Sequence, residues 1–263
     1  MGAPLERSEL SVGPDPRHPP AGPSQPGARD PAGMGEQIGY DLIVQQLIPG
    51  YASLARLAVS LLAASPLASG EGSAVLVAGC GTGAELLEAR AQRPDWQLTA
   101  IDPSAAMLAE AQRRLQRQAP GGSEAASGAI RWLQTTVEEL ALPAAFDGAL
   151  SVLVLQSLPD DGSKLTFLSS LARTLRPGGQ LVLVDLMRSE RSPLRSQVTD
   201  AWRLFQRASG LEGAPEALAS LSPHLHPIGL SRLSALVNAA GFSDPAPVFQ
   251  ALDFQGFLLQ RSA

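Results

Sequence analysis

Three closely spaced glycines carry the first chemical signal in this sequence. The stretch Gly79-Cys80-Gly81-Thr82-Gly83 follows the apolar run AVLVA at 74–78 and precedes a helical pattern that begins near Ala84. Glycine lets a backbone turn sharply and approach a ligand closely, and the N-terminus of a helix offers unpaired N–H groups. The stretch therefore predicts a loop that binds a cofactor, although a tight turn without a ligand would have the same spacing.

An acidic residue follows the next apolar run. Asp102 comes directly after WQLTAI at 96–101, about 20 residues beyond the glycine loop. A carboxylate at that point can accept hydrogen bonds from both hydroxyls of a ribose. Asp102 could instead cap the following helix, but Ser104 is the better cap because it leads directly into the apolar positions of a helical run. We therefore expect Asp102 to contact a ribose.

Polar candidates for the reacting end of a site lie further along the chain. Gln156 directly follows the apolar run at 146–155, at the edge where open α/β folds bind ligands, and a turn or cap is the alternative role. His224 and His226 occur between prolines in SPHLHP and could supply a base or belong to a surface loop. Two histidines without a nearby Cys, Asp or Glu predict no metal site.

Two further features are expected to be structural. Cys80 should fill space within the glycine loop rather than act as a nucleophile, because no histidine lies near it in the sequence. The arginines at 113, 114 and 117 follow Asp102 on a helix and are expected to form a solvated face.

Strands and helices alternate along the chain, which predicts the scaffold for these residues. The β-rich runs lie at 74–78, 96–101, 130–135, 146–155 and 180–186, and helices are expected from about Ala84, Ser104 and Asp161. Two helices should precede the first strand from Glu36 onward, and a helix at Leu230–Ala240 should precede β-like runs at 247–250 and 253–260. This alternation predicts an α/β fold with a doubly wound, mostly parallel sheet covered on both faces. The pattern between 189 and 229 is irregular, and no element is expected there.

The composition favours one folded domain without a general affinity for polyanions. The chain has 263 residues, 44% of them hydrophobic, and a formal net charge of −5. This charge gives no attraction for anionic lipid or nucleic acid, and a single lysine, Lys164, also disfavours RNA as substrate. One cysteine, no apolar run long enough to span a bilayer and no visible targeting signal predict a cytoplasmic protein.

The first 35 residues differ in composition from the rest. They hold 8 of the 22 prolines and almost no large apolar side chains. Such a segment cannot bury enough surface to offset the entropy of ordering. We expect a disordered tail over residues 1–35 and a single domain over residues 36–263.

The glycine loop, the stretch IDPSAAML and the stretch LRPGGQLVLVD together resemble the class I S-adenosylmethionine-dependent methyltransferases. The resemblance implies a Rossmann-like seven-stranded fold, S-adenosylmethionine as cofactor, and methyl transfer to a small-molecule acceptor. In that family the loop passes under the methionine part, the acid after the second strand holds the ribose, and the turn Arg176-Pro177-Gly178-Gly179 leads into the fifth strand. The cofactor contacts implied here are Gly79, Cys80, Gly81, Thr82, Gly83, Asp102, Pro103, Met107, Val137 and Tyr51, with Met107 against the adenine.

A nearer resemblance concerns both ends of the domain. The stretches EQIGYDLIVQQLIPGY and AAGFSDPAPVFQALDFQGFL are similar to carboxy-S-adenosylmethionine synthase and its methyltransferase relatives. This resemblance implies that Tyr40 and Tyr51 are lid residues over the cofactor, with ordinary helix packing as the alternative. Such relatives often form dimers, so a homodimer is a further expectation.

Two departures from these relatives matter. The synthase would need an arginine before the terminal helix for its extra carboxylate, and the sequence between Arg207 and Arg232 has no Lys or Arg, which disfavours carboxy chemistry. Many relatives have an acid where Thr136 stands, to bind the adenine amino group. Glu138 or the backbone N–H of Val137 could serve instead.

Several functions remain as alternatives to methyl transfer. A sulfonium already makes its methyl group electrophilic, so alignment can carry much of the rate, and Gln156, His224 and Tyr40 are weak candidates for a catalytic residue. A carboxy-S-adenosylmethionine synthase-like or tRNA-modification enzyme is one alternative, and a non-catalytic cofactor-binding regulator is another. The glycine spacing also fits an NAD(P)-dependent oxidoreductase, but residues 98–108 and 173–185 match the methyltransferase signatures together.

Overall fold

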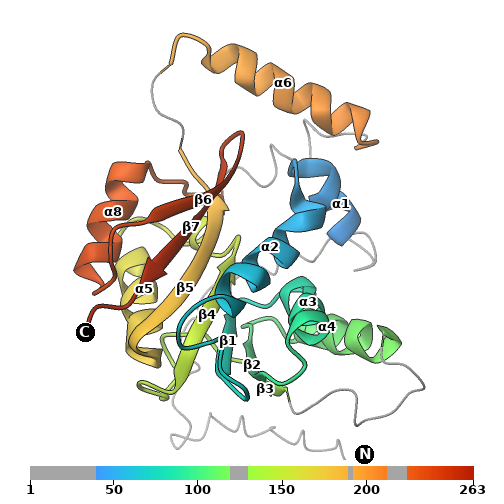
Figure 1. The fold of residues 1–263 in the computed structure, drawn as a ribbon. Coiled ribbons are helices and arrows are strands. Elements are labelled where there is room, and N and C mark those ends of the chain that lie inside the picture. Colours follow the sequence, from blue (N-terminus) through green and yellow to red (C-terminus); the bar gives the residue numbers. More distant parts are fainter. Residues whose placement is uncertain (1–39, 119–129, 189–191, 212–223) are drawn as a thin grey trace, which may run out of the picture. The chain divides into compact units, whose positions relative to one another are not determined.

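A seven-stranded sheet organises the part of the chain that the computed structural model describes, residues 40–118, 130–188, 192–211 and 224–263 (Figure 1). The strands lie in the order β3-β2-β1-β4-β5-β7-β6. They are β1 (Ala74–Ala78), β2 (Gln97–Ile101), β3 (Arg131–Leu133), β4 (Phe146–Val152), β5 (Leu175–Leu186), β6 (Ala246–Ala251) and β7 (Phe254–Gln260). Neighbouring strands from β3 to β5 in this order are parallel. Strand β7 is antiparallel to both β5 and β6, so it alone runs against the others and the expected doubly wound, mostly parallel sheet is confirmed. The tail expected over residues 1–35 lies outside the described residues.

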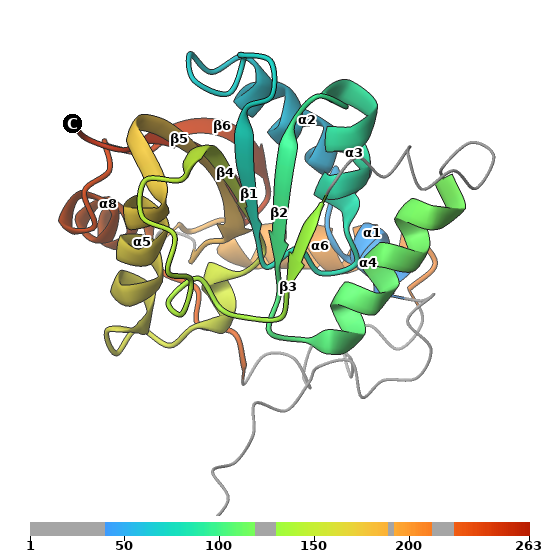
Figure 2. The same cartoon turned by 90° about the horizontal axis from the view of Figure 1, so that it is seen from below.

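Helices cover both faces of the sheet, as Figure 2 shows from below. One face packs against α2 (Tyr51–Ala63), α3 (Ala84–Gln92) and α4 (Ala105–Gln118), which share a buried apolar cluster with β1, β2, β4 and β5. The other face packs against α5 (Ser163–Thr174) and α8 (Leu230–Ala239). Strand β1 lies inside the sheet and is buried on both sides, so it is a continuous apolar run, AVLVA, rather than an alternating one.

Two boundaries differ from the expectations. The helix α6 (Arg195–Ala208) lies in a stretch where no element was expected, and Gln206 is its one buried residue. Its Trp202 donates a hydrogen bond to the carbonyl of Leu47 (2.7 Å) at the end of α1 (Tyr40–Leu47). The strand β5 begins at Leu175 rather than at 180, and the residues from 176 to 179 form an irregularity within it, since Phe146 pairs with Leu175 but Gly148 pairs with Gln180.

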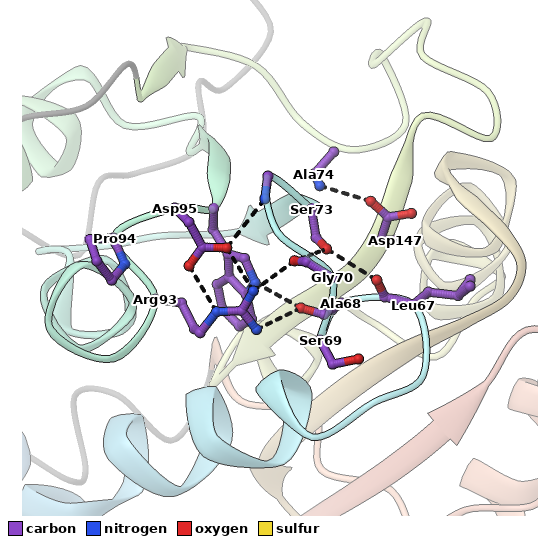
Figure 3. Close-up of polar contacts among 12 residues, drawn as sticks. Leu67, Ala68, Ser69, Gly70, Ser73, Ala74, Arg93, Pro94, Asp95 and Asp147 are labelled. Atoms are coloured by element: carbon purple, nitrogen blue, oxygen red, sulfur yellow. Dashed lines mark hydrogen bonds and ion pairs between the residues drawn. The ribbon is translucent and has the colours of Figure 1, made fainter.

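A polar cluster closes the amino-terminal end of β1 and β2, as the close-up in Figure 3 shows. The guanidinium of Arg93 forms an ion pair with Asp95 (2.7 Å), donates to the carbonyls of Ala68 (3.0 Å) and Gly70 (2.7 Å), and lies over the ring of Trp96. Asp95 in turn accepts a hydrogen bond from the N–H of Gly72 (3.2 Å). These contacts fix the turn that leads into β1, so that β1 begins in register with β2.

Replacing Asp95 with Asn should lower the Tm at pH 7 and should have little effect near pH 2. The hydrogen bonds from Arg93 lower the pKa of Asp95 from 3.8 to about 2, so the ionised carboxylate stabilises the fold. A lowered pKa gives stability that is present above about pH 4 and is lost as the pH falls toward 2. Thermal melts of both proteins between pH 7 and pH 2 measure the difference, and a difference that stays constant over this range would contradict the ionic role.

Candidate functional site

The glycine loop at 79–83 lies at the carboxyl end of β1 and is tied to the neighbouring strand β2. The N–H groups of Gly79 and Cys80 both donate to the carbonyl of Ile101, at 2.9 and 3.0 Å. The N–H of Gly81 donates to Oδ2 of Asp102 at 2.9 Å. The loop is therefore held in one shape by the end of β2, without help from a ligand.

The three glycines of the loop serve different purposes. All three have positive φ angles. A Cβ on Gly79 would lie 2.4 Å from Val154, and one on Gly83 would lie 2.9 Å from Ala111 in α4, so packing of the protein requires glycine at both positions. A Cβ on Gly81 would meet nothing within 4 Å. The backbone at Gly81 thus borders open space that a ligand can approach closely.

Asp102 is buried, with 8% of its surface exposed, and both of its oxygens accept backbone hydrogen bonds. Oδ2 accepts from Gly81, and Oδ1 accepts from the N–H of Ser104 (2.9 Å). The hydroxyl of Ser104 accepts from the N–H of Met107 (3.3 Å), so Ser104 caps α4 as expected. Asp102 therefore ties the glycine loop to the start of α4.

The other expected cofactor residues differ in how deeply they are buried. Pro103 is exposed directly after β2, whereas Met107 in α4 and Val137 after β3 are buried. Tyr51 is the first residue of α2 and is half-buried against two apolar clusters, which agrees with the packing role held open for it. Tyr40 begins α1, and its side chain lies outside the described part of the structure. Their contacts with a cofactor stay predictions.

The thiol of Cys80 is expected to be unreactive in this position. Its side chain is buried, and burial raises the pKa of the thiol, with the charges of Asp102 and Glu85 acting in the same direction. The thiolate, which is the nucleophilic form, is therefore strongly disfavoured. This agrees with a space-filling role.

Arg114 departs from the expected solvated face of α4. Arg113 and Arg117 do form ion pairs with Glu110, each at 2.8 Å. Nη1 of Arg114 instead donates to both the carbonyl (3.0 Å) and the hydroxyl (2.9 Å) of Thr82 in the glycine loop. The expectation was wrong for Arg114 because α4 packs at Ala111 against the loop, and residues three apart lie on the same side of a helix.

Gln156 lies in the short helix η5 (Leu155–Ser157) at the carboxyl end of β4 and takes part in three hydrogen bonds. Its N–H donates to Oδ1 of Asp185 (2.9 Å), and its carbonyl accepts from the N–H of His226 (2.6 Å). Its side-chain oxygen accepts from the N–H of Leu186 (3.1 Å), which leaves the amide nitrogen as the group available to a ligand. These bonds support the turn role, and contact with a transferred methyl group stays a prediction.

Beneath η5 lies a buried pair of opposite charges that the sequence analysis missed. Lys164 in α5 and Asp185 in β5 are each only 1% exposed. Nζ of Lys164 donates to the carbonyl of Leu155, and Oδ1 of Asp185 accepts from the N–H groups of Gln156 and Leu186. Oδ2 of Asp185 has no hydrogen-bond partner among the described residues. The available signal was an acid ending the apolar run QLVLVDL and the sole lysine of the chain.

Burial dominates the protonation of this pair. It raises the pKa of Asp185 to about 7, while the charge of Lys164 and the backbone hydrogen bonds act in the opposite direction. Burial also lowers the pKa of Lys164. Both shifts follow from the cost of holding a charge away from water.

The remaining features are the two histidines and a cavity beside α6. His224 and His226 are exposed, and within the described ranges no three His, Cys, Asp or Glu side chains gather where they could hold a metal ion. A cavity of about 100 Å³ lies between α6 and the β6–β7 turn. It is lined by Arg195, Val198, Thr199, Trp202, Leu252, Asp253 and Phe254.

No helix in the described ranges has both the length and the apolar composition that a membrane span requires.

Comparison with known proteins points to one class of enzyme. Residues 76–183 match a family described as a methyltransferase domain. The chain is 31% identical over 141 residues to the O-methyltransferase resE of Aspergillus sclerotiorum, a match that covers 53% of this chain and 50% of that protein. It is 26% identical to a carboxy-S-adenosyl-L-methionine synthase of Pseudomonas fluorescens, over 82% of this chain and 86% of that protein.

Two further findings concern how much of each relative the chain covers and which solved structure has a similar fold. The chain spans 30 to 58% of the length of the first three curated relatives that it matches. The fold is similar to that of 1,6-didemethyltoxoflavin-N1-methyltransferase from Burkholderia thailandensis, with a TM-score of 0.55 and 19% identity. This likeness covers 86% of this chain and 83% of that one.

Proposed function

Since this chain belongs to the class I S-adenosylmethionine-dependent methyltransferases, we propose that it transfers a methyl group from S-adenosylmethionine to a small-molecule acceptor. The observation that carries the proposal is the glycine loop, which Asp102 ties to β2 through the N–H of Gly81 (2.9 Å). Sites at this edge of an open α/β sheet bind ligands between the loops that follow the strands.

The residues present fit the proposed cofactor. The open space at Gly81 admits a ligand close to the backbone, and the carboxylate of Asp102 beside it is a group of the type that accepts ribose hydroxyls. The resemblance to methyltransferases assigns Met107 and the backbone N–H of Val137 to the adenine, and both residues are buried. A solved methyltransferase of the same fold has S-adenosylhomocysteine bound, which supports a ligand of this class here.

The chemistry requires positioning more than acid–base catalysis. When bound, S-adenosylmethionine supplies an electrophilic methyl group on its sulfonium. The task of the protein is then to hold the nucleophilic atom of the acceptor in line with that methyl group and to exclude water. Gln156, at the end of β4, can orient an acceptor through its amide nitrogen because its oxygen is engaged by Leu186.

The cavity beside α6 is a candidate acceptor site for a small molecule. The cavity beside α6 is lined by Trp202, Phe254 and Val198, and the two aromatic rings meet edge to face with centroids 5.8 Å apart. The lining also includes Thr199 and the ion pair of Arg195 with Asp253 (3.1 Å), and such a combination of aromatic and polar side chains is typical of small-molecule sites. The net charge of −5 and the single lysine argue against a nucleic-acid acceptor.

Carboxy-S-adenosylmethionine chemistry is the less favoured alternative, although synthases of this ligand are relatives of the chain. Its additional carboxylate would need a cation, since an unpaired charge is costly to bury. The sequence from Ala208 to Ser231 contains no Lys or Arg. Arg203 and Arg207 of α6 are the nearest arginines before that interval in the sequence.

Isothermal titration with defined ligands tests the proposal. S-adenosylmethionine and S-adenosylhomocysteine should bind with micromolar affinity, whereas NAD and NADP should give no saturable heat. A screen of small phenols, amines and heterocycles, scored by release of S-adenosylhomocysteine, then identifies the acceptor. Saturable binding of a nicotinamide cofactor without a response to either sulfur ligand would overturn the assignment. Tight cofactor binding without turnover of any acceptor would instead indicate a regulator.

A further inference from the structure

The glycine loop forms hydrogen bonds on two sides. The contacts with Ile101 and Asp102 involve residues of the sequence motif, whereas the contact with Arg114 does not. On the β2 side, the carbonyl of Ile101 and the carboxylate of Asp102 accept the N–H groups of the first three loop residues. On the α4 side, one nitrogen of Arg114 donates to the carbonyl and to the hydroxyl of Thr82. The loop therefore depends on a side chain from a helix that follows it by about 30 residues.

The position of Thr82 makes this contact consequential. Thr82 is 4% exposed and lies between Gly81, whose backbone borders open space, and Gly83, which is the N-cap of α3. A buried carbonyl and a buried hydroxyl that lose a charged donor incur a desolvation cost. The chain can relieve that cost by turning the peptide groups around Thr82, and such a rotation would move the backbone of Gly81 that faces the ligand.

The neighbouring arginines of α4 contact Glu110 rather than the glycine loop, so they can serve as controls for Arg114. Arg113 and Arg117 both pair with the buried carboxylate of Glu110, at 2.8 Å each, and each of them is more than half exposed. Arg114 is half-buried and reaches the loop instead. The same helix thus offers an arginine at the loop and two arginines at Glu110.

We propose that Arg114 is a positioning residue that holds the glycine loop in its ligand-binding shape through Thr82 and thereby sets the affinity for S-adenosylmethionine. This inference rests on the proposed function. A loop that is already ordered loses less conformational entropy when a ligand binds, so its preorganisation appears directly in the affinity. Arg114 acts without being assigned any contact with the cofactor itself.

The test compares Arg114→Met with the matched control Arg113→Met, and uses S-adenosylhomocysteine as the titrated ligand. Both variants remove one charge from adjacent positions of α4, so the general electrostatic effect is the same. Arg114→Met should raise the Kd about tenfold or more, which is the effect of losing one hydrogen bond to a charged group. Arg113→Met should stay within about twofold of the wild type. Equal affinities of the two variants would overturn the inference.

Further variants separate positioning from general stability. Arg114→Lys keeps the charge but lacks the planar guanidinium, so its Kd should lie between those of the wild type and Arg114→Met. Thr82→Val keeps the shape and removes the hydroxyl, and adding it to Arg114→Met should cost less affinity than Thr82→Val costs alone. Strictly additive losses in this cycle would contradict action through Thr82.

Hydrogen exchange gives a readout that a loss of global stability would not mimic. In the ligand-free protein, the amides at 79–83 should exchange faster in Arg114→Met than in Arg113→Met, while the amides of β4 and β5 should stay protected alike. Uniformly faster exchange would indicate a purely structural arginine and overturn the inference. A wild type that fails to bind S-adenosylhomocysteine overturns the proposed function, whereas wild-type binding with an unaffected Arg114→Met overturns this inference alone.

Discussion

Replacement of Lys164 with Met should lower the free energy of unfolding by about 1 to 3 kcal/mol at pH 8, the range for leaving a buried polar group without its charged hydrogen-bond partner. Met matches the length of the aliphatic stem, so the change removes the ammonium group and little packing. The carbonyl of Leu155 then loses its donor, and the buried carboxylate of Asp185 loses the positive charge that opposes its desolvation.

The size of this loss should depend on pH in a defined direction. In the wild type the pKa of Asp185 is raised to about 7, above the value near 4 of an unfolded chain. The folded state therefore binds more protons than the unfolded state between about pH 4 and pH 7, and stability falls as the pH rises through this window. Without Lys164 the pKa of Asp185 rises further, so the decline continues above pH 7. The difference between the two proteins should consequently be larger at pH 8 than at pH 6.

Urea unfolding at both pH values provides the measurement, with Asp185→Asn as the matched variant. Asn keeps an oxygen that can accept the N–H groups of Gln156 and Leu186, but it cannot ionise. The double variant should therefore lose less stability at pH 8 than Lys164→Met alone. A loss below about 1 kcal/mol, or one independent of pH, would show that Lys164 does not compensate the charge of Asp185.

The strands and most helices could be predicted from the sequence because burial on both faces leaves a local signal. Runs such as AVLVA become β1 with the same bounds, and the alternation with helices specifies the parallel sheet. The helix α6 was missed although Val198, Trp202 and Phe205 recur at helical spacing within it. Its side chains are mostly exposed, and the contact of Trp202 with α1 joins segments far apart in the sequence, so the pattern does not specify where the helix packs.

The candidate site was predictable where a contact is local and not where it joins distant segments. The Asp102 carboxylate meets the loop because adjacent parallel strands end at the same edge, and the capping role of Ser104 follows from its neighbours. The contact of Arg114 with Thr82 depends on which side of α4 meets the loop, and this is set by the close packing at Gly83. The meeting of Lys164 and Asp185 depends on how α5 packs onto β5, and sequence spacing does not specify it.

These contacts divide the site into two halves with separate supports. The half that would hold the cofactor is fixed by Asp102 and Arg114 around the glycine loop. The half that would face the acceptor is fixed by Lys164 and Asp185 beneath η5. Variants in the first half should therefore change ligand affinity more than stability, and variants in the second half should do the reverse.

Replacing Asp102 with Ala should weaken the binding of S-adenosylhomocysteine by about 2 to 4 kcal/mol, the range for removing a charged partner from buried hydrogen bonds. Two effects contribute, because the carboxylate accepts the N–H of Gly81 at 2.9 Å and would also accept the ribose hydroxyls. The variant should still fold, since the loop keeps its bonds to the carbonyl of Ile101. Calorimetric titration together with a thermal melt measures both properties.

A ligand that lacks a ribose hydroxyl separates the two effects. The wild type should bind S-adenosylhomocysteine more tightly than its 2′-deoxy analogue, because the analogue cannot donate one of the hydrogen bonds to Asp102. Asp102→Ala should bind the two ligands almost equally, at the lower affinity of a loosened loop. A variant that keeps the full preference for the hydroxyl would assign ribose binding to another residue and leave Asp102 with the loop alone. A variant that melts and binds like the wild type would show that Asp102 serves neither purpose.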